Sequence, residues 1–311
     1  MRQTKPQRLT SPAPVTVTAW TLLLVLTALV CSTVSAEPIS VTDSQGRLIK
    51  LVSPARRIVA LAPHLVENVY SAGAGGKLVG VVGYSDFPPA AQSLPIVGDF
   101  GTFSIERVAQ LEPDLILMWG SGNGATAWER LQPLGIPVYV DEIRRLDDIP
   151  TSLRNIGKLA GTEALAEAAA QQFESNIDAL RSRYASSIDV SVFYQIWHEP
   201  LQTLGGEHLM NQIISLCGGN NVFADAPGLA PVVSIESLLV ANPTAIIASG
   251  AGPDRPSWLD EWQKYPTLSA VQTQQIYYID PDLIQRPTLR LIRGAEQVCL
   301  DLNKARQHAL N

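Results

Sequence analysis

The 311-residue sequence has little positive charge. Its formal net charge is −6 at pH 7. The first 36 residues contain Arg2, Lys5 and Arg8 and no acidic residue, so their removal takes the net charge to −9. Nucleic-acid-binding domains present a basic surface. The composition therefore argues against a nucleic-acid partner.

The sequence also lacks the motifs of the common enzyme classes. It contains no G-x-S-x-G, no H-E-x-x-H and no phosphate-binding G-x-x-x-x-G-K-[ST]. Ser85, next to Asp86, has no evident histidine partner. The four histidines (His64, His198, His208 and His308) do not pair at metal-ligand spacing. We expect no enzyme, no cofactor and no metal site, with an exported hydrolase as the alternative from another class.

No hydrophobic run is long enough to span a membrane, which needs about 20 residues. The run AWTLLLVLTALV at 19–30 has 12 residues, follows the three basic residues, and precedes the small-residue sequence VSA at 34–36. This is the pattern of a signal peptide, here residues 1–36 with cleavage after Ala36. The alternative is an uncleaved anchor. Cys31 follows Val30, whereas lipidation favours a small residue there. We expect an exported, soluble, periplasmic protein.

Cysteine is scarce, and only Cys217 and Cys299 remain after the predicted cleavage. An even pair in an oxidising compartment is usually a disulfide. Two separately buried thiols are the alternative.

One short phrase occurs twice. SIERVAQLEP at 104–113 and SIESLLVANP at 234–243 are each followed by the pattern of a buried strand, DLILMWG and TAIIASG. Around both copies, strand patterns alternate with short helical ones, which indicates βα units on a parallel sheet. We predict an α/β fold of two similar lobes, 37–147 and 187–311, with a ligand cleft between them.

The segment 148–186 between the lobes has no strand pattern. Leu153, Ile156 and Leu159 share one helical face, and apolar residues continue in steps of three and four to Tyr184. We expect either one long helix or two with a break at Gly161. The segment has no Gly/Ser-rich hinge, so the connection should be rigid.

The repeated phrase places an acid at the start of each helix. If Ser104 and Ser234 are N-caps, Glu106 and Glu236 occupy the second helical position, not the third that a capping box uses. Their carboxylates then need not fold back onto their own backbones. A favourable interaction with the helix dipole is the simpler explanation for either one alone. Two of them on matching surfaces would suit arginine partners.

Several segments together resemble the periplasmic cobalamin (vitamin B12)-binding proteins of ABC importers, a family of helical-backbone substrate-binding proteins. They are RIVALAPHLVENVYSAGAGGKLVGVVGYSDFPP, SIERVAQLEPDLIL, NQIISLCGGNNVF and SIESLLVANP. The resemblance covers about residues 56–303. It implies cobalamin in the interlobe cleft, docking of Glu106 and Glu236 onto arginine pockets of the permease dimer, and support for the Cys217–Cys299 pair.

A corrin ring needs apolar and aromatic walls with a few polar groups. Tyr84 and Asp282 match ligand-contacting residues of the resembling family, and Phe100 stands where its members carry an aromatic. The remaining candidates follow predicted strands or begin the last helix: Trp119, Trp197 and Arg286. The loops at 197–204 and 226–232 depart from the family, with Ala230 at an aromatic position, so haem or a ferric siderophore stays an alternative ligand.

Overall fold

The computed structural model describes residues 1–9, 38–184, 187–250 and 252–309. Residues 38–311 form one compact unit and residues 1–37 another, of which 1–9 have no regular secondary structure. Most of the predicted signal peptide, with Cys31 and Ala36, lies outside the described residues. None of the described helices combines the length and hydrophobicity that crossing a membrane requires.

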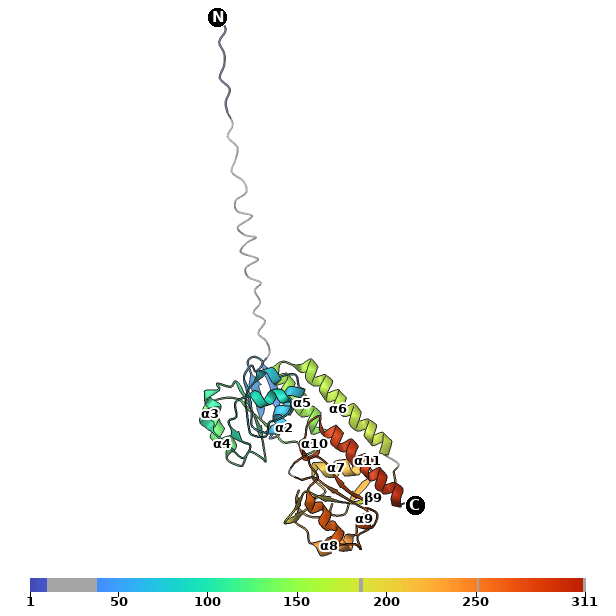
Figure 1. The fold of residues 1–311 in the computed structure, drawn as a ribbon. Helices are drawn as coiled ribbons and strands as arrows, with labels where there is room; N and C mark the ends of the chain where they lie inside the picture. The colour runs from blue at the N-terminus through green and yellow to red at the C-terminus, as the bar shows by residue number, and fades with distance from the viewer. Residues whose placement is uncertain (10–37, 185–186, 251, 310–311) are drawn as a thin grey trace. The chain divides into compact units, whose positions relative to one another are not determined.

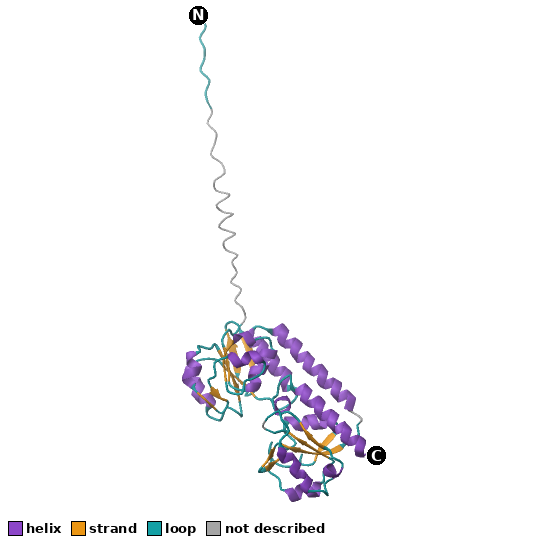
Figure 2. Cartoon of the chain, in the orientation of Figure 1, coloured by secondary structure: helices purple, strands orange, loops and turns teal. Residues whose placement is uncertain are grey.

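Two four-stranded parallel sheets form the centres of the two lobes (Figures 1 and 2). Their strands are β3 (Ile58–Ala60), β4 (Leu78–Val81), β7 (Leu115–Trp119) and β8 (Val138–Asp141), then β9 (Val190–Gln195), β12 (Gly219–Asn221), β13 (Ala245–Ala248) and β14 (Ile276–Tyr278). The spatial orders are β4-β3-β7-β8 and β12-β9-β13-β14. In both sheets, the strand that comes first along the chain lies between the second and the third. The prediction of two similar α/β lobes is confirmed.

Short helices and hairpins surround each sheet. The first lobe has β1 (Ile39–Thr42), β2 (Leu48–Leu51), α2 (Pro63–Ser71), η1 (Gly75–Lys77), η2 (Pro89–Ser93), β5 (Gly98–Asp99), β6 (Thr102–Phe103), α3 (Ile105–Gln110), α4 (Ala127–Leu131) and η3 (Gln132–Leu134). The second has β10 (Trp197–His198), β11 (Leu201–Gln202), α7 (Leu209–Leu216), α8 (Ile235–Ala241), η4 (Ser257–Lys264), α9 (Ser269–Gln272) and α10 (Pro281–Ile284).

The central strands are mostly apolar, as expected where both faces of each sheet are covered. In β7, Leu115 and Leu117 face one hydrophobic cluster while Ile116 and Met118 face another. The second sheet divides its side chains in the same way between two clusters. The side chains at the carboxyl ends of the strands are left to form a site.

The segment between the lobes is a pair of helices, α5 (Asp148–Ala160) and α6 (Glu163–Tyr184). Gly161 ends α5 in the left-handed conformation, with φ of 67°. The second of the two sequence predictions, a break at this glycine, is therefore right. Helix α11 (Leu291–Ala309) lies beside α6 (Figure 1), and it begins after Arg286, which the sequence analysis placed at the start of this helix.

A disulfide joins Cys217, at the end of α7, to Cys299 in α11, with their Cα atoms 4.7 Å apart. Both cysteines are fully buried in the core of the second lobe. The predicted pairing is confirmed, and it links two helices that cover the second sheet.

Candidate functional site

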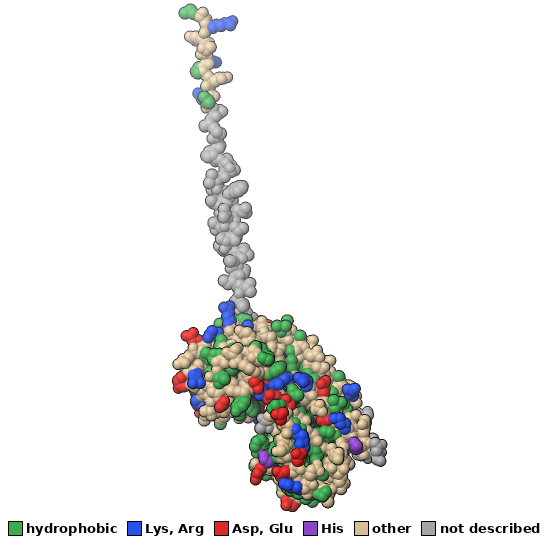
Figure 3. All heavy atoms as spheres, viewed as in Figure 1, with side chains coloured by type: hydrophobic (Ala, Val, Ile, Leu, Met, Phe, Trp, Pro, Cys, Tyr) green, Lys and Arg blue, Asp and Glu red, His purple; other side chains and the backbone are tan. Residues whose placement is uncertain are grey.

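A pocket of about 150 Å³ lies between the lobes. The first lobe contributes His64, Trp119, Ser121 and residues 142–144, and the second contributes 207–209, Leu229, Gln285 and Pro287. Figure 3 shows a hollow in the molecule where the two lobes meet, with acidic side chains gathered near it. Ligand pockets commonly enclose about 300–1,000 Å³. A bulky ligand must therefore also rest on the exposed side chains around this pocket.

Aromatic side chains form the first lobe's part of this region. Trp119, at the end of β7, packs against Phe100 with ring centroids 5.9 Å apart, so the structure brings these two predicted residues together. His64 meets Trp119 edge-to-face at 5.1 Å. Burial, and then the charge of Arg286, lower the pKa of His64 to about 3. Its imidazole is thus neutral and adds to an apolar wall.

Tyr84 presents its ring to solvent, with 74% of the residue exposed. Its φ is 63°, in the left-handed region that a tyrosine rarely adopts and that costs free energy. Such strained residues cluster at ligand sites. Phe87, three residues later, is also exposed. This loop thus offers two aromatic surfaces to a ligand, one of which the sequence reasoning missed.

The second lobe offers a different set of rings. Trp197 is partly exposed, and its indole N–H donates to the Glu199 carbonyl at 3.0 Å. The neighbouring His198 stacks on Trp258, with centroids 5.2 Å apart and planes 7° apart. His198 and Trp258 also line a pocket of about 350 Å³ with Trp262. Trp197 contacts this lobe's rings and not the Phe100–Trp119 pair.

Asp282 and Arg286 lie one turn apart and form an ion pair at 3.0 Å. Burial is the main cause that raises the pKa of Asp282, against the opposing charge of Arg286. Burial alone would lower the pKa of Arg286, but hydrogen bonds to Asp86 and Glu67 raise it overall. Only 16% of the Arg286 side chain is exposed, so its ion pairs are largely buried and differ from ordinary surface salt bridges. The two predicted residues belong to one charged cluster that joins the lobes.

The two predicted docking acids are both fully exposed and stand at corresponding helix starts, in α3 and α8. Each N-cap serine accepts a hydrogen bond from the third helical N–H, as expected. Hydrogen bonds from the residue's own backbone N–H, and then from the N-cap serine, lower the pKa of Glu106 and of Glu236.

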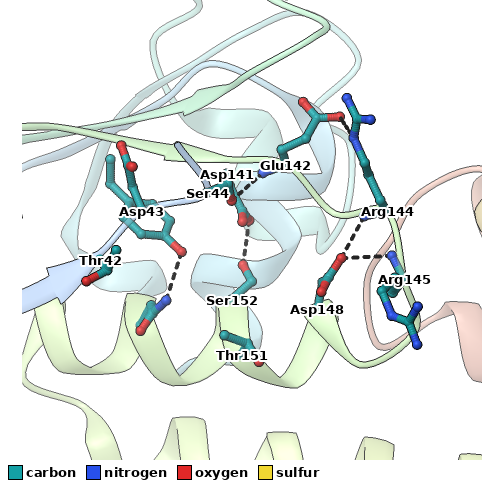
Figure 4. Close-up of a pocket in the computed structure, with 12 residues that line it drawn as sticks. Thr42, Asp43, Ser44, Asp141, Glu142, Arg144, Arg145, Asp148, Thr151 and Ser152 are labelled. Carbon is teal, nitrogen blue, oxygen red and sulfur yellow. Dashed lines mark hydrogen bonds and ion pairs between the residues drawn. The ribbon is translucent and has the colours of Figure 1, made fainter. Parts of the chain in front are cut away.

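A larger pocket, of about 430 Å³, lies between β8 and α5 (Figure 4) and shares Glu142 and Arg144 with the pocket between the lobes. Figure 4 shows Asp141 pointing to Ser152, whose hydroxyl donates to it at 2.5 Å. Burial raises the pKa of Asp141 to about 6. Asp148 accepts hydrogen bonds from the backbone N–H groups of Arg144 and Arg145. These groups are occupied with one another, which indicates a structural role. Across the described residues, no group of three or more metal-ligating side chains comes together.

A model of the periplasmic binding protein family matches residues 58–283. The chain belongs to the periplasmic binding protein family. The resemblance inferred from the sequence is therefore confirmed at the level of the family.

Curated relatives of this periplasmic binding protein carry a more specific name. The vitamin B12-binding protein of Vibrio cholerae serotype O1 is 38% identical over 254 residues, which cover 82% of this chain and 91% of that protein. The vitamin B12-binding protein of Pectobacterium carotovorum is 36% identical over 249 residues, covering 79% and 88%.

Solved structures agree on the fold. The crystal structure of the periplasmic vitamin B12-binding protein BtuF of Vibrio cholerae has a TM-score of 0.74 at 37% identity, covering 81% of this chain and 98% of that one. The periplasmic heme-binding protein RhuT of Roseiflexus has a TM-score of 0.72 at 22% identity, covering 81% and 99%. The second likeness shows the two-lobe fold alone.

Proposed function

We propose that this periplasmic binding protein captures cobalamin between its lobes and delivers it to the permease of an ABC importer. The observation that carries the proposal is the identity of 36–38% to vitamin B12-binding proteins over about four fifths of the chain. The pocket lined from both lobes supports it, because a flat macrocycle can contact both walls at once. Capture and delivery require no covalent step.

The predicted ligand contacts suit a corrin. Tyr84, Phe100, Trp119 and Trp197 offer aromatic faces to the apolar ring. Asp282 and Arg286 offer one acceptor and one donor group, which can pair with the N–H and C=O of peripheral carboxamides. The walls thus provide the apolar contact and the polar anchors that such a ligand needs.

Delivery depends on two exposed acids. Glu106 and Glu236 occupy equivalent places in the two lobes, and a permease built from two copies of one subunit would present two equivalent arginine pockets. We propose these glutamates as the docking residues. We also propose export to the periplasm with cleavage after Ala36.

Calorimetric titration of the mature chain, residues 37–311, tests the ligand directly. The probes are cyanocobalamin, haemin and a ferric siderophore. Saturable one-to-one binding of cyanocobalamin, tighter than that of the other two, is expected. Tighter binding of haemin or of the siderophore would replace cobalamin as the ligand, and turnover of any probe would contradict a binding role.

A further inference from the structure

Glu67 is a carboxylate buried at the junction of the lobes. It lies in α2 of the first lobe, and only 2% of its side chain is exposed. It accepts hydrogen bonds from Arg286 at 3.0 Å, from Arg290 at 2.6 and 2.9 Å, and from the hydroxyl of Thr288 at 3.1 Å. All three donors come from the 286–290 segment of the second lobe. Burying an ionised carboxylate is unfavourable unless it is paired in this way.

Neighbouring contacts fix the same segment. The side-chain amide of Asn68 donates to the Pro287 carbonyl at 3.2 Å. Arg290 also lies over the ring of Phe87, 4.2 Å from its centroid. Because Phe87 and Tyr84 share one loop, the segment is held against the loop that presents both exposed rings. Glu67 is thus at the centre of the contacts that orient Arg286.

The cluster has more negative than positive charge. Arg286 bonds Glu67, Asp86 at 2.9 Å and Asp282 at 3.0 Å, and Arg290 bonds Glu67. Two guanidinium groups therefore face three carboxylates. With its carboxylate partners in place, Arg286 has donors left for a neutral acceptor but no uncompensated positive charge to attract an anion.

We propose that Glu67, which is buried behind Arg286, is a specificity-determining residue that makes this site prefer a carboxamide-fringed macrocycle over one with carboxylates. It acts through Arg286, by holding the guanidinium in place and cancelling its charge. This deepens the proposed function and rests on it. A peripheral carboxamide can accept from Arg286 and donate to Asp282, whereas a peripheral carboxylate can only accept and is repelled by the surplus acid.

The test compares two ligands that differ by one charge. Cyanocobalamin and its monocarboxylic acid, in which one peripheral carboxamide is hydrolysed, are titrated into the mature chain and into Glu67→Gln. The measured quantity is the ratio of the dissociation constant for the acid to that for the amide. We expect Glu67→Gln to lower this ratio by about tenfold, because one carboxylate of the cluster is removed and the arginines are freed. A purely structural role would weaken both ligands equally and leave the ratio unchanged, which would overturn the proposal.

Three further variants make the outcome decisive. Asp86→Asn removes a carboxylate from the same arginine at a side chain that is 51% exposed, so folding is not at risk. It should lower the ratio by about threefold, and no change would also overturn the proposal. Glu67→Asp keeps the charge and should keep the ratio near that of the parent. Glu163→Gln, an exposed position at the start of α6, changes the net charge by the same amount and should have no effect.

The two proposals fail in different ways. If the parent chain does not bind cyanocobalamin, the proposed function is wrong. If it binds cyanocobalamin and the ratio does not respond to Glu67→Gln, only the role of Glu67 is wrong.

Discussion

The two lobes share a topology but differ in the chemistry of their surfaces. Each has the same strand order in its four-stranded sheet, and in each a Ser-Ile-Glu helix lies along the chain between the second and third strands of that sheet. The second lobe has a disulfide and its own group of rings around Trp258. The first has a buried acid, Asp141, at the end of β8, whereas the matching strand β14 ends at Tyr278. A shared fold thus places equivalent helices while the walls and the sources of stability diverge.

Of the differences between the lobes, loss of the disulfide in the second lobe should have the largest effect on stability. Replacing Cys217 and Cys299 together with alanine removes a cross-link that closes 82 positions of chain. We expect the free energy of unfolding to fall by about 4 kcal/mol, since the open chain gains conformational entropy when unfolded. Urea unfolding followed by tryptophan fluorescence measures this. An unchanged midpoint would show that the cross-link adds nothing to the second lobe.

Asp141, in the first lobe, should make the stability of the protein depend on pH. Its pKa is raised by burial to about 6 in the folded protein, so the folded state binds its proton more tightly than the unfolded state. The protonated carboxyl group of Asp141 therefore contributes to the free energy of unfolding below about pH 4, and this contribution is lost as the pH rises through 6. Asp141→Asn, which keeps an acceptor for Ser152, should remove this loss and gain roughly 3 kcal/mol at neutral pH. Thermal unfolding at pH 4 and pH 7 is the measurement, and parallel curves for variant and parent would contradict it.

The two proposed docking residues, Glu106 and Glu236, should differ only modestly in their effect on binding to the permease. The charge of Arg130 also acts on Glu106, and Arg107 follows it in α3, whereas hydrogen bonds alone lower the pKa of Glu236. Cations near Glu106 already offset part of its attraction for arginine. We expect Glu236→Arg to weaken binding to the reconstituted permease about tenfold and Glu106→Arg about threefold. Ligand affinity measured by calorimetry is the control. Equal losses would show that the lobes dock alike, and a fall in ligand affinity would contradict the docking assignment.

The sequence predicted the features that depend on local pattern. The apolar runs gave the central strands, the serines of both repeated phrases cap their helices, and the two cysteines pair. Each of these needs only neighbouring residues or, for the cysteines, simple elimination. The repeat also indicated two similar lobes, but the order of the strands within each sheet came only from the structure.

The charged cluster could not be found in this way. Glu67 lies inside a helix pattern, where an acid normally faces solvent, and its partners are about 220 positions away. Only the meeting of the lobes makes the helix bury it. Trp258 was missed for a related reason, because its stacking on His198 depends on how η4 folds against β10. The local sequence gives no signal for Glu67, because the residues three and four positions away on its helix face include His64, Tyr70 and Ser71.

Helix α5 has a consequence for how the molecule folds. Its first half gives Ile149 and Leu153 to the interior of the second lobe, and its second half gives Ile156 and Leu159 to the interior of the first. A cut on either side of this helix would expose a hydrophobic stripe on one fragment and leave a cavity in the other. Neither half is therefore an autonomous folding unit, and denaturation of residues 38–311 should be a single cooperative event.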